Sequence, residues 1–263
     1  MATTGPDGPE ADPTLVRDIE EASLASWPAL ETIVDGSWRI RVATGQTGRA
    51  NSVTFLDRDD GGNAERRIAA AEAVYRAHGL PPMFRITPLT PKTVLQACDR
   101  LGYRSCDPTR TLWHPGLAAA PISDGIETVV APIPTCEWLD AVSAFSEFSE
   151  AKRSGMKQKL ARLAIPAAFI VLRIDGLAVA TVMATVHGGR LGVLDLAVSP
   201  DKRRRGLARA AIGEAIRWGG THGAGEIWLQ VVAGNAPAEA LYRTLEFEEI
   251  YPYGYRTPDE AAR

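Results

Sequence analysis

The sequence has few of the features that mark secreted, membrane or nucleic-acid-binding proteins. Three of its 263 residues are cysteine, which excludes a disulfide framework. No apolar run approaches the roughly 20 residues that a membrane-spanning helix needs, and the N-terminus lacks a signal-peptide pattern. A formal net charge of −3 gives no general attraction to a polyanion. We therefore expect a cytoplasmic protein that binds neither nucleic acid nor a membrane.

The chain is long enough for one large domain or two small ones, and a hydrophobic content of 45% allows a real core. Residues 1–13 are polar and rich in proline and glycine, which predicts a disordered leader. A second such stretch, at 116–125, predicts a linker. These two segments divide the chain into an N-terminal domain, 14–115, and a C-terminal domain, 126–263.

The two parts of the chain share an order of patterns. Residues 70–105 and residues 212–250 both predict helix, strand, helix and strand, with an aromatic residue at the start of each last strand. An internal repeat of this size indicates two related halves. Among the longer elements, a helical stretch is expected over roughly 135–163 and strands at 167–174, 177–187 and 190–198.

Positive charge is concentrated in the stretch DLAVSPDKRRRGLARAAIGEAI, residues 195–216. Four cationic residues, Lys202 to Arg205, follow an apolar run and precede Gly206 and a helix-forming segment. The start of a helix offers unpaired N–H groups and a positive dipole end, and glycine lets a ligand approach the backbone closely. Arginines add charge that pairs with phosphate. The turn therefore predicts an anion site suited to a pyrophosphate.

The same turn carries a family resemblance. Val198-x-Pro200 followed by Arg203-x-x-Gly206-x-Ala208 resembles the acetyl-CoA motif of the GNAT superfamily of N-acetyltransferases. The motif stands between a predicted strand and a predicted helix, which is the context that it requires.

A second element follows at the distance expected for this family. The segment Asn235 to Tyr242, followed by Phe247, resembles the Asn-x-x-Ala-x-x-Leu-Tyr-x-x-x-Gly-Phe segment of the superfamily. One departure is Glu246, where glycine is usual. The resemblance covers about residues 126–256.

The resemblance implies an α/β (α+β) fold of two tandem GNAT-like domains. Each would be a mixed, mostly antiparallel sheet flanked by helices, and the sheet of the C-terminal domain would splay open beside the strand at 190–198. Acetyl-CoA, as cosubstrate, would lie in that splay. The residues implied to contact it are Leu196, Ala197, Val198, Arg203, Arg204, Arg205, Gly206, Leu207, Ala208, Asn235 and Tyr242.

The implied activity is transfer of an acetyl group to a primary amine by direct attack in a ternary complex, without a metal. Tyr242 is implied to be the general acid that returns a proton to the departing thiolate. Asp195 is a weak candidate for the general base. The alternatives are His187, Glu147 and Glu150. Acidic residues before residue 155 slightly favour a cationic acceptor among the small-molecule and peptide amines.

The N-terminal half lacks the motif, and its equivalent turn, DRDDGGN at 57–63, is acidic. We expect this half to be degenerate in its cofactor site, because carboxylates repel a pyrophosphate. The segment DGSWRIRVATGQTGRANSV, at 35–53, either lines a pocket between the domains or alternates as a half-exposed strand. Both interpretations stay open, as does a monomeric or homodimeric state.

Two other functions compete with the transferase. One is a non-catalytic acyl-CoA sensor. The other is a protein that binds a different nucleotide at the basic turn. A P-loop is excluded because no Gly-x-x-x-x-Gly-Lys-Ser/Thr occurs, and a Rossmann site is disfavoured because Gly206 lacks companion glycines.

Overall fold

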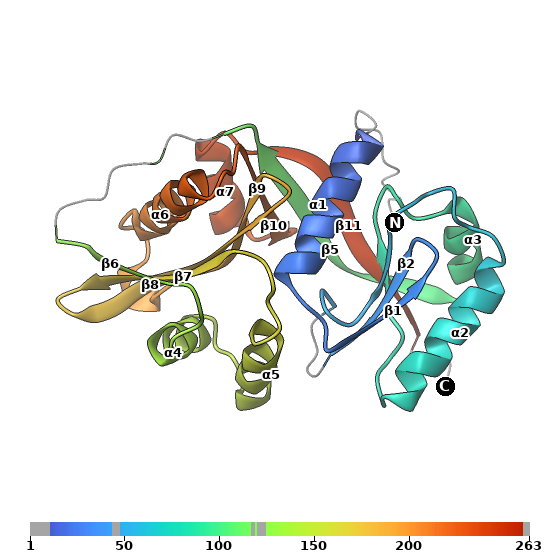
Figure 1. Ribbon diagram of the computed structural model, residues 1–263. Coiled ribbons are helices and arrows are strands. Elements are labelled where there is room, and N and C mark those ends of the chain that lie inside the picture. The colour runs from blue at the N-terminus through green and yellow to red at the C-terminus, as the bar shows by residue number, and fades with distance from the viewer. Residues whose placement is uncertain (1–10, 44–47, 117–118, 120–124, 260–263) are drawn as a thin grey trace.

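A computed structural model describes residues 11–43, 48–116, 119 and 125–259. The strands form one 11-stranded sheet in the order β1-β2-β3-β4-β11-β5-β10-β9-β8-β7-β6 (Figure 1). The predicted leader, apart from its last residues, and most of the predicted linker lie outside the described residues.

The bounds of the elements follow the order of the chain. In the first half they are α1 (Pro13–Ser26), β1 (Glu31–Asp35), β2 (Trp38–Val42), β3 (Val53–Phe55), α2 (Ala64–Ala77), β4 (Phe84–Ile86), α3 (Lys92–Arg100) and β5 (Tyr103–His114). In the second half they are β6 (Glu127–Ala131), α4 (Cys136–Phe145), α5 (Glu150–Leu160), β7 (Ala167–Ile174), β8 (Leu177–His187), β9 (Arg190–Val198), the short 3-10 helix η1 (Pro200–Lys202), α6 (Leu207–Thr221), β10 (Glu226–Val232), α7 (Ala236–Thr244) and β11 (Glu248–Pro258).

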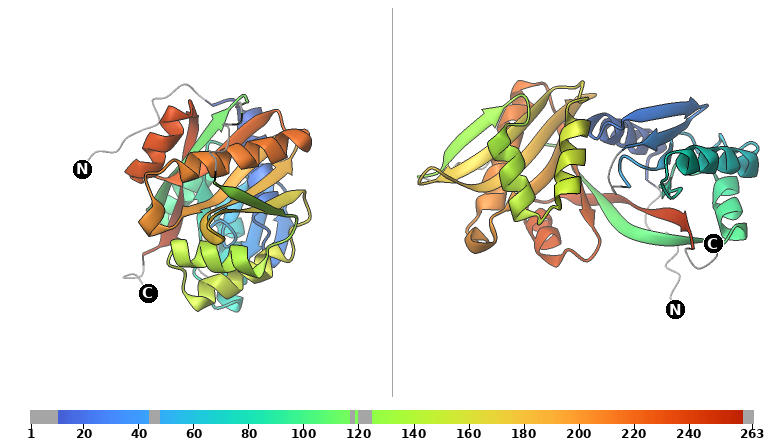
Figure 2. Two further views of the ribbon diagram at one scale, coloured as in Figure 1. Left: turned by 90° about the vertical axis from the view of Figure 1, so that its left-hand side faces the viewer. Right: turned by 90° about the horizontal axis from the view of Figure 1, so that it is seen from below.

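The last strand of each half is inserted into the other half. Strand β5 lies between β11 and β10, and β11 lies between β4 and β5. The two exchanged strands pair antiparallel along almost their whole length, from Glu248 opposite Trp113 to Pro258 opposite Tyr103 (Figures 1 and 2). The division into 14–115 and 126–263 therefore describes the order of the chain, whereas in space the sheet is continuous across it.

The predicted repeat is present in the structure. The series α2-β4-α3-β5 of the first half corresponds to α6-β10-α7-β11 of the second, and each half contains one parallel strand pair in an otherwise antiparallel sheet. Gly102 after α3 and Glu246 after α7 both have left-handed backbones, with φ of 72° and 59°. Glu246 thus adopts the turn that glycine usually makes, at a strain of order 1 kcal/mol.

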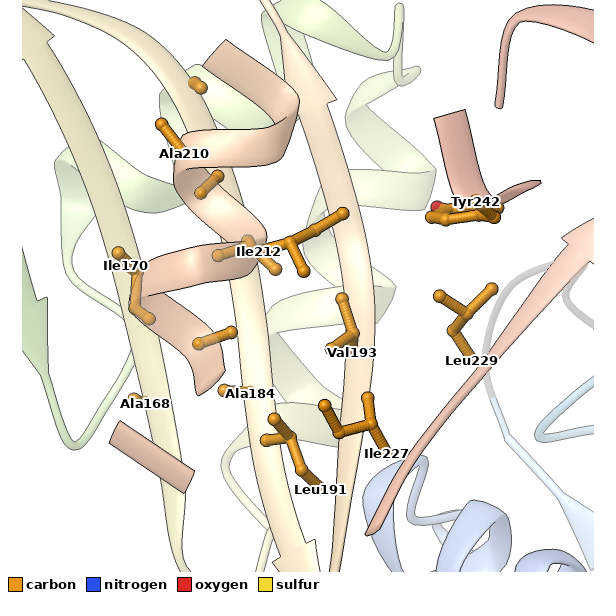
Figure 3. Close-up of a cluster of buried hydrophobic side chains, with 14 of the residues drawn as sticks. Ala168, Ile170, Ala184, Leu191, Val193, Ala210, Ile212, Ile227, Leu229 and Tyr242 are labelled. Carbon is orange, nitrogen blue, oxygen red and sulfur yellow. The ribbon is translucent and has the colours of Figure 1, made fainter. Parts of the chain in front are cut away.

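Helices cover both faces of the second half of the sheet. Helix α6 lies on one face, and α4 and α5 lie on the other (Figure 2). Along β7, Ile170 points into the cluster beneath α6, and its neighbour Phe169 points into the cluster beneath α4 and α5. Figure 3 shows the first cluster, in which Ile212 of α6 packs near Val193 of β9. Because both faces are buried, these strands are continuous apolar runs.

Three boundaries differ from the sequence prediction. The helical stretch expected over 135–163 consists of two separate helices, α4 and α5, and Glu147 between them has a left-handed φ of 52°. The Ser149 side chain accepts a hydrogen bond from Lys152 N and starts the second helix anew. Pro13, assigned to the leader, is the first residue of α1, which Asp12 caps. Strands β1 and β6 were not predicted.

A buried ion pair joins three elements where the halves meet. Arg85 on β4 donates two hydrogen bonds of 2.7 Å to the carboxylate of Glu20 on α1. The Tyr251 hydroxyl of β11 donates a third, also of 2.7 Å, to the same carboxylate. The side chains of Arg85 and Glu20 are 3% and 1% exposed. Such a pair is costly to break, because removing one charge leaves the other buried and uncompensated.

We expect Glu20→Gln to lower the free energy of unfolding by about 3–5 kcal/mol, because Arg85 then stays charged in the interior. The matched control is Glu65→Gln, which removes the partner of Arg100 from a pair whose side chains are 59% and 63% exposed. That change should cost less than about 1 kcal/mol. Urea unfolding measures both; equal losses in the two variants would refute the role given to the buried pair.

Candidate active site

The sheet opens between β9 and β10. The two strands pair in parallel from Arg190 opposite Glu226 to Val193 opposite Leu229, and there the pairing ends. Beyond that point β9 continues to Val198 on β8 alone, and β10 continues on β5 alone. The backbone of 194–198 therefore faces an opening on the side of β10, where the resemblance implies the splay.

A β-bulge lies at the start of this opening. The register of β9 against β8 shifts between Leu194 and Ala197, so that β9 has one residue more than its partner. Asp195, inside the shift, has a left-handed φ of 47°. A bulge bends its strand and redirects a side chain. The Asp195 carboxyl consequently lies near Lys159 of α5, on the side opposite α6.

The basic turn ends at an uncapped helix. Arg204 and Gly206 have left-handed backbones, with φ of 64° and 77°, and Gly206 stands at the N-cap of the 15-residue helix α6. No side chain caps the first turn, so its N–H groups are left for another acceptor. A Cβ built on Gly206 meets no atom within 4 Å. Open space, free N–H groups and the positive helix end together form a site that fits a pyrophosphate.

The three arginines of the motif surround this space from the surface. Arg203, Arg204 and Arg205 are exposed, and Leu207 directly after Gly206 is buried beneath them. Arg203 is held loosely, with its Nε 3.4 Å from the carbonyl oxygen of Val198. In the structure, the basic turn, the start of α6 and the end of β9 thus lie together, as the sequence predicted.

Tyr242 lies on the α6 side of the opening. Its ring is 8% exposed and meets Phe247 edge to face at 5.8 Å, and Figure 3 shows it next to Leu229. Burial raises the pKa of Tyr242 to about 12, so the phenol stays protonated at neutral pH. The hydroxyl has no hydrogen bond to any residue that the structure describes.

Asn235 has a structural task besides the one that the resemblance implies. Its side-chain oxygen accepts a hydrogen bond of 3.3 Å from Ala238 N and so caps α7. Asn235 is exposed at the surface. The cap positions α7, and with it Tyr242.

Asp195 has the properties of a general base. Its Oδ2 atom is buried and has no hydrogen-bond partner among the described residues. Burial raises the pKa of Asp195 to about 6, although Arg49, Lys152 and Lys159 act to lower it. A carboxylate of this kind is charged at neutral pH, yet basic enough to accept a proton.

The other three candidate bases do not reach the opening. His187 ends β8 opposite Arg190, the first residue of β9. Arg190 precedes Asp195 by five residues, which is about 16 Å along a strand. His187 lines a separate cavity of about 480 Å³ that also contacts α1 and β2. Glu150 is 80% exposed and lies 3.8 Å from Arg153. Glu147 is exposed between α4 and α5.

Residues that the sequence did not single out surround Asp195. Arg49 comes from the first half and is hydrogen-bonded to Tyr253 of β11, whose hydroxyl also donates to Gln230 Oε1 at 3.0 Å. Arg49 and Lys159 lie 5.9 Å and 5.6 Å from the ring of Trp27. The only signal for Arg49 was its place in the segment at 35–53, for which a pocket between the halves was one of two interpretations.

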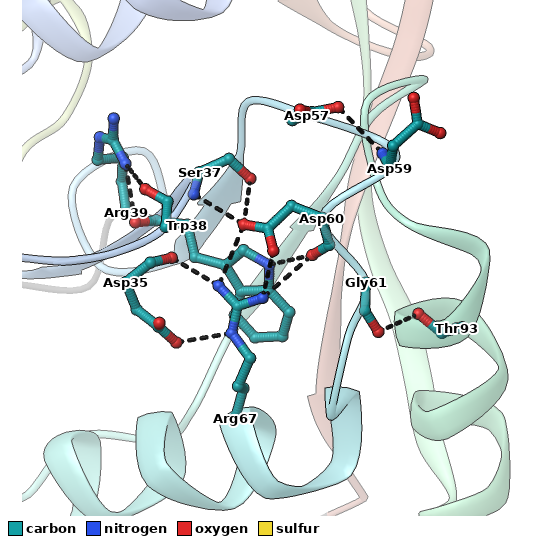
Figure 4. Close-up of polar contacts among 11 residues, drawn as sticks. Asp35, Ser37, Trp38, Arg39, Asp57, Asp59, Asp60, Gly61, Arg67 and Thr93 are labelled. Carbon is teal, nitrogen blue, oxygen red and sulfur yellow. Dashed lines mark hydrogen bonds and ion pairs between the residues drawn. The ribbon is translucent and has the colours of Figure 1, made fainter.

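The equivalent turn in the first half also leads to a helix without a side-chain cap, but a network of charged side chains lies beside it. The pairing of β3 with β4 consists of one residue pair, Val53 opposite Phe84, and α2 starts after Asn63 in a left-handed conformation with φ of 53°. Beside this turn Asp60 accepts hydrogen bonds of 2.8 Å from Ser37 N and from Arg67 Nη1 (Figure 4).

The carboxylate of Asp60 thus supplies the negative charge that an external anion would bring. The Arg67 hydrogen bond lowers the pKa of Asp60 to about 2. The Arg67 guanidinium also lies 4.0 Å from the ring of Trp38 and donates to Asp35. Among the described residues, the helix start of the first half thus differs from that at Gly206 in having these paired charges beside it.

Known proteins match nearly all of the chain. A family model described as "Probable histone acetyltransferase Rv0428c C-terminal" matches residues 14–256. The chain belongs to this acetyltransferase family. A curated relative, "Uncharacterized N-acetyltransferase YobR" of Bacillus subtilis (strain 168), is 27% identical over 245 residues, which cover 92% of this chain and 98% of the relative.

Two solved structures share the fold. A GCN5-related N-acetyltransferase from Kribbella flavida has a TM-score of 0.70 at 16% identity and covers 94% of this chain and 95% of its own. A tandem GNAT protein from the clavulanic acid biosynthesis pathway has a TM-score of 0.66 at 13% identity, with coverage of 91% and 86%. The protein is thus an N-acetyltransferase of the GNAT superfamily with two GNAT-like halves. The predicted family and the predicted tandem fold are both confirmed.

The described part of the acetyltransferase has neither a membrane-spanning helix nor a cluster of metal ligands. None of its described helices is both long and apolar enough to cross a bilayer. No three His, Cys, Asp or Glu side chains within the described ranges stand together as metal ligands.

We expect Asp60→Asn to destabilise the acetyltransferase by about 1–2 kcal/mol at neutral pH, allowing for solvent screening of a carboxylate that is 31% exposed. A carboxyl whose pKa is lowered in the folded state stabilises the fold at pH values above its pKa in the unfolded chain. This contribution is lost as the pH falls through its pKa in the folded protein. The difference between wild type and variant should therefore shrink between about pH 4 and about pH 2. Urea unfolding at several pH values measures it; a difference that persists at about pH 2 would contradict the assignment.

Proposed function

We propose that the protein transfers an acetyl group from acetyl-CoA to a primary amine by direct attack in a ternary complex at the β9–β10 opening. The observation that carries this proposal is the continuity of the site: the opened strands lead directly to the uncapped start of α6 at Gly206. Acetyl-CoA would supply the activated acetyl group. Its pantetheine would face the free backbone of Leu196, Ala197 and Val198.

The proton transfers are assigned to two side chains on opposite sides of the opening. Asp195 accepts the proton that the attacking amine loses, directly or through water, because its buried oxygen is unpaired and its pKa is raised to about 6. Tyr242 donates a proton to the sulfur as the carbon–sulfur bond breaks, since its pKa of about 12 keeps it protonated. The products are the N-acetylated amine and CoA, and no covalent acetyl-enzyme is needed.

One cofactor site per chain is proposed, in the second half. The carboxylate of Asp60 disfavours a pyrophosphate at the turn of the first half. A cytoplasmic location, a monomeric or homodimeric state and the lack of nucleic-acid binding stay predictions.

Titration calorimetry should find one acetyl-CoA bound per chain, and Gly206→Glu should abolish the binding because its side chain fills the open space and adds negative charge. Asn63→Glu is the matched control, since Asn63 holds the same left-handed position before α2 and should leave binding unchanged. Circular dichroism checks that both variants fold. Two sites per chain, or equal effects of the two variants, would contradict the assignment.

The pH dependence of turnover should separate the two proton carriers. The ratio of wild-type to Asp195→Asn kcat/KM should rise about tenfold per pH unit up to about pH 6 and then level off, because the wild type must ionise Asp195 to act. The titration of the acceptor amine cancels in this ratio. Tyr242→Phe should lower kcat about 10²–10⁴-fold with acetyl-CoA affinity nearly intact.

A panel of amines identifies the acceptor for this experiment, with release of the CoA thiol as the readout. A flat ratio across the pH range would exclude Asp195 as the base. Undiminished turnover in Tyr242→Phe would return Tyr242 to a packing role.

A further inference from the structure

The acceptor side of the opening is cationic. Asp195 is faced by Arg49 from the first half and by Lys152 and Lys159 from α5. Two of the acidic residues before residue 155 that favoured a cationic acceptor, Glu147 and Glu150, are exposed. The electrostatics of the site therefore run opposite to the sequence prediction.

Two of these cations share Asp195 as an electrostatic partner but form no direct ion pair within the part of the chain that the structure describes. Lys159 is 4% exposed, and Arg49 is half-buried against the ring of Trp27. Neither forms an ion pair with a carboxylate of the described residues. A buried ammonium without a partner loses its hydration, and burial lowers the pKa of Lys159 to about 8. Two like charges beside one indole are costly unless an anion joins them.

Two residues near these cations carry further buried donors. The Nε1 atom of Trp27 and the Nε2 atom of Gln230 are buried and have no hydrogen-bond partner among the described residues. Both are donors, as are Arg49 and Lys159. Gln230 is tied to Arg49 through Tyr253, because the Tyr253 hydroxyl contacts both. Unsatisfied donors near unpaired cations indicate an acceptor group that a ligand would supply.

We infer that the acceptor is an amine that also carries a carboxylate, as a free amino acid does, and that Arg49 and Lys159 bind this carboxylate beside Trp27. This inference rests on the proposed transferase function and names its substrate class. Arginine offers a planar fork that matches a carboxylate, and lysine adds a point charge. With the carboxylate held there, the amine of the same small molecule lies toward Asp195.

The first half of the acetyltransferase is then a working part of the acceptor site. Trp27 and Arg49 belong to the first half, and Lys159 and Asp195 belong to the second. Arg41 fixes this arrangement, since its guanidinium donates to the carbonyl oxygens of Arg49 and Trp27. The exchanged strand β11 contributes Tyr253, whose hydroxyl contacts Arg49.

The test compares free amino acids with the corresponding amino acid amides, with acetyl-CoA as donor and CoA thiol release as readout. At least one free amino acid should be acetylated with kcat/KM at least about tenfold above that of its amide, since the lost ion pair is worth about 1.4 kcal/mol or more. The amide has the less basic amine, which is more often unprotonated at neutral pH, so a preference for the acid reports binding.

Arg49→Gln and Lys159→Met should each reduce kcat/KM for the free amino acid about tenfold or more relative to that for the amide, so that the ratio approaches one. Any effect that acts through the pKa of Asp195 is common to both substrates and cancels in this ratio. The control is Arg66→Gln, which removes an exposed arginine of α2 and should leave the ratio unchanged. A purely structural role of Arg49 would lower both rates together.

Calorimetry with acetyl-CoA accompanies every assay. Without acetyl-CoA binding, the proposed function itself fails. With binding intact, acetylation of amides as good as that of acids, acetylation of neither, or a ratio unchanged in both Arg49→Gln and Lys159→Met overturns the inference alone.

Discussion

The exchange of the last strands is the constraint on which the rest of the acetyltransferase depends. Because β5 lies between β11 and β10, the open end of β10 is held by a strand of the other half. The opening beside β9 is therefore bounded by residues of both halves. The buried contacts of Glu20 with Arg85 and Tyr251 lock α1 onto this junction. Together with the hydrogen bond from Arg41 to the Trp27 carbonyl oxygen, these contacts hold Trp27 in place after the end of α1.

The two halves share the same strand and helix arrangement at the start of α2 and of α6, but differ in the charges beside it. In each, a parallel strand pair parts early and a helix starts after a left-handed residue, Asn63 in the first half and Gly206 in the second. The difference lies in the charge beside that residue. Asp60 and Arg67 neutralise each other in the first half, whereas the second half has three exposed arginines beside Gly206 and, among the described residues, no atom within 4 Å of a Cβ built there.

The sequence predicted the features that local patterns encode. The motif around Gly206, the strands of the second half and the repeat were evident because short-range apolar periodicity and turn chemistry determine them. Strand exchange was not predictable, since the pairing of Glu248 with Trp113 joins residues far apart in the chain. The break between α4 and α5 was missed because the apolar spacing continues across Glu147. Arg49 was missed as a site residue because only tertiary structure brings it to Asp195.

The pKa of Asp195 is set by burial, which raises it, and by cations from both halves, which lower it. Burial alone would push this carboxyl further toward its neutral form, and cations at closer range would make it too weak a base. Arg49 and Lys159 stand near enough to lower the pKa without forming an ion pair with the carboxylate. A bound carboxylate would offset part of their charge and so raise the basicity of Asp195 at the moment when the amine is in place. Binding of the acceptor and activation of its amine would then be coupled through the two cations, one of which belongs to the first half.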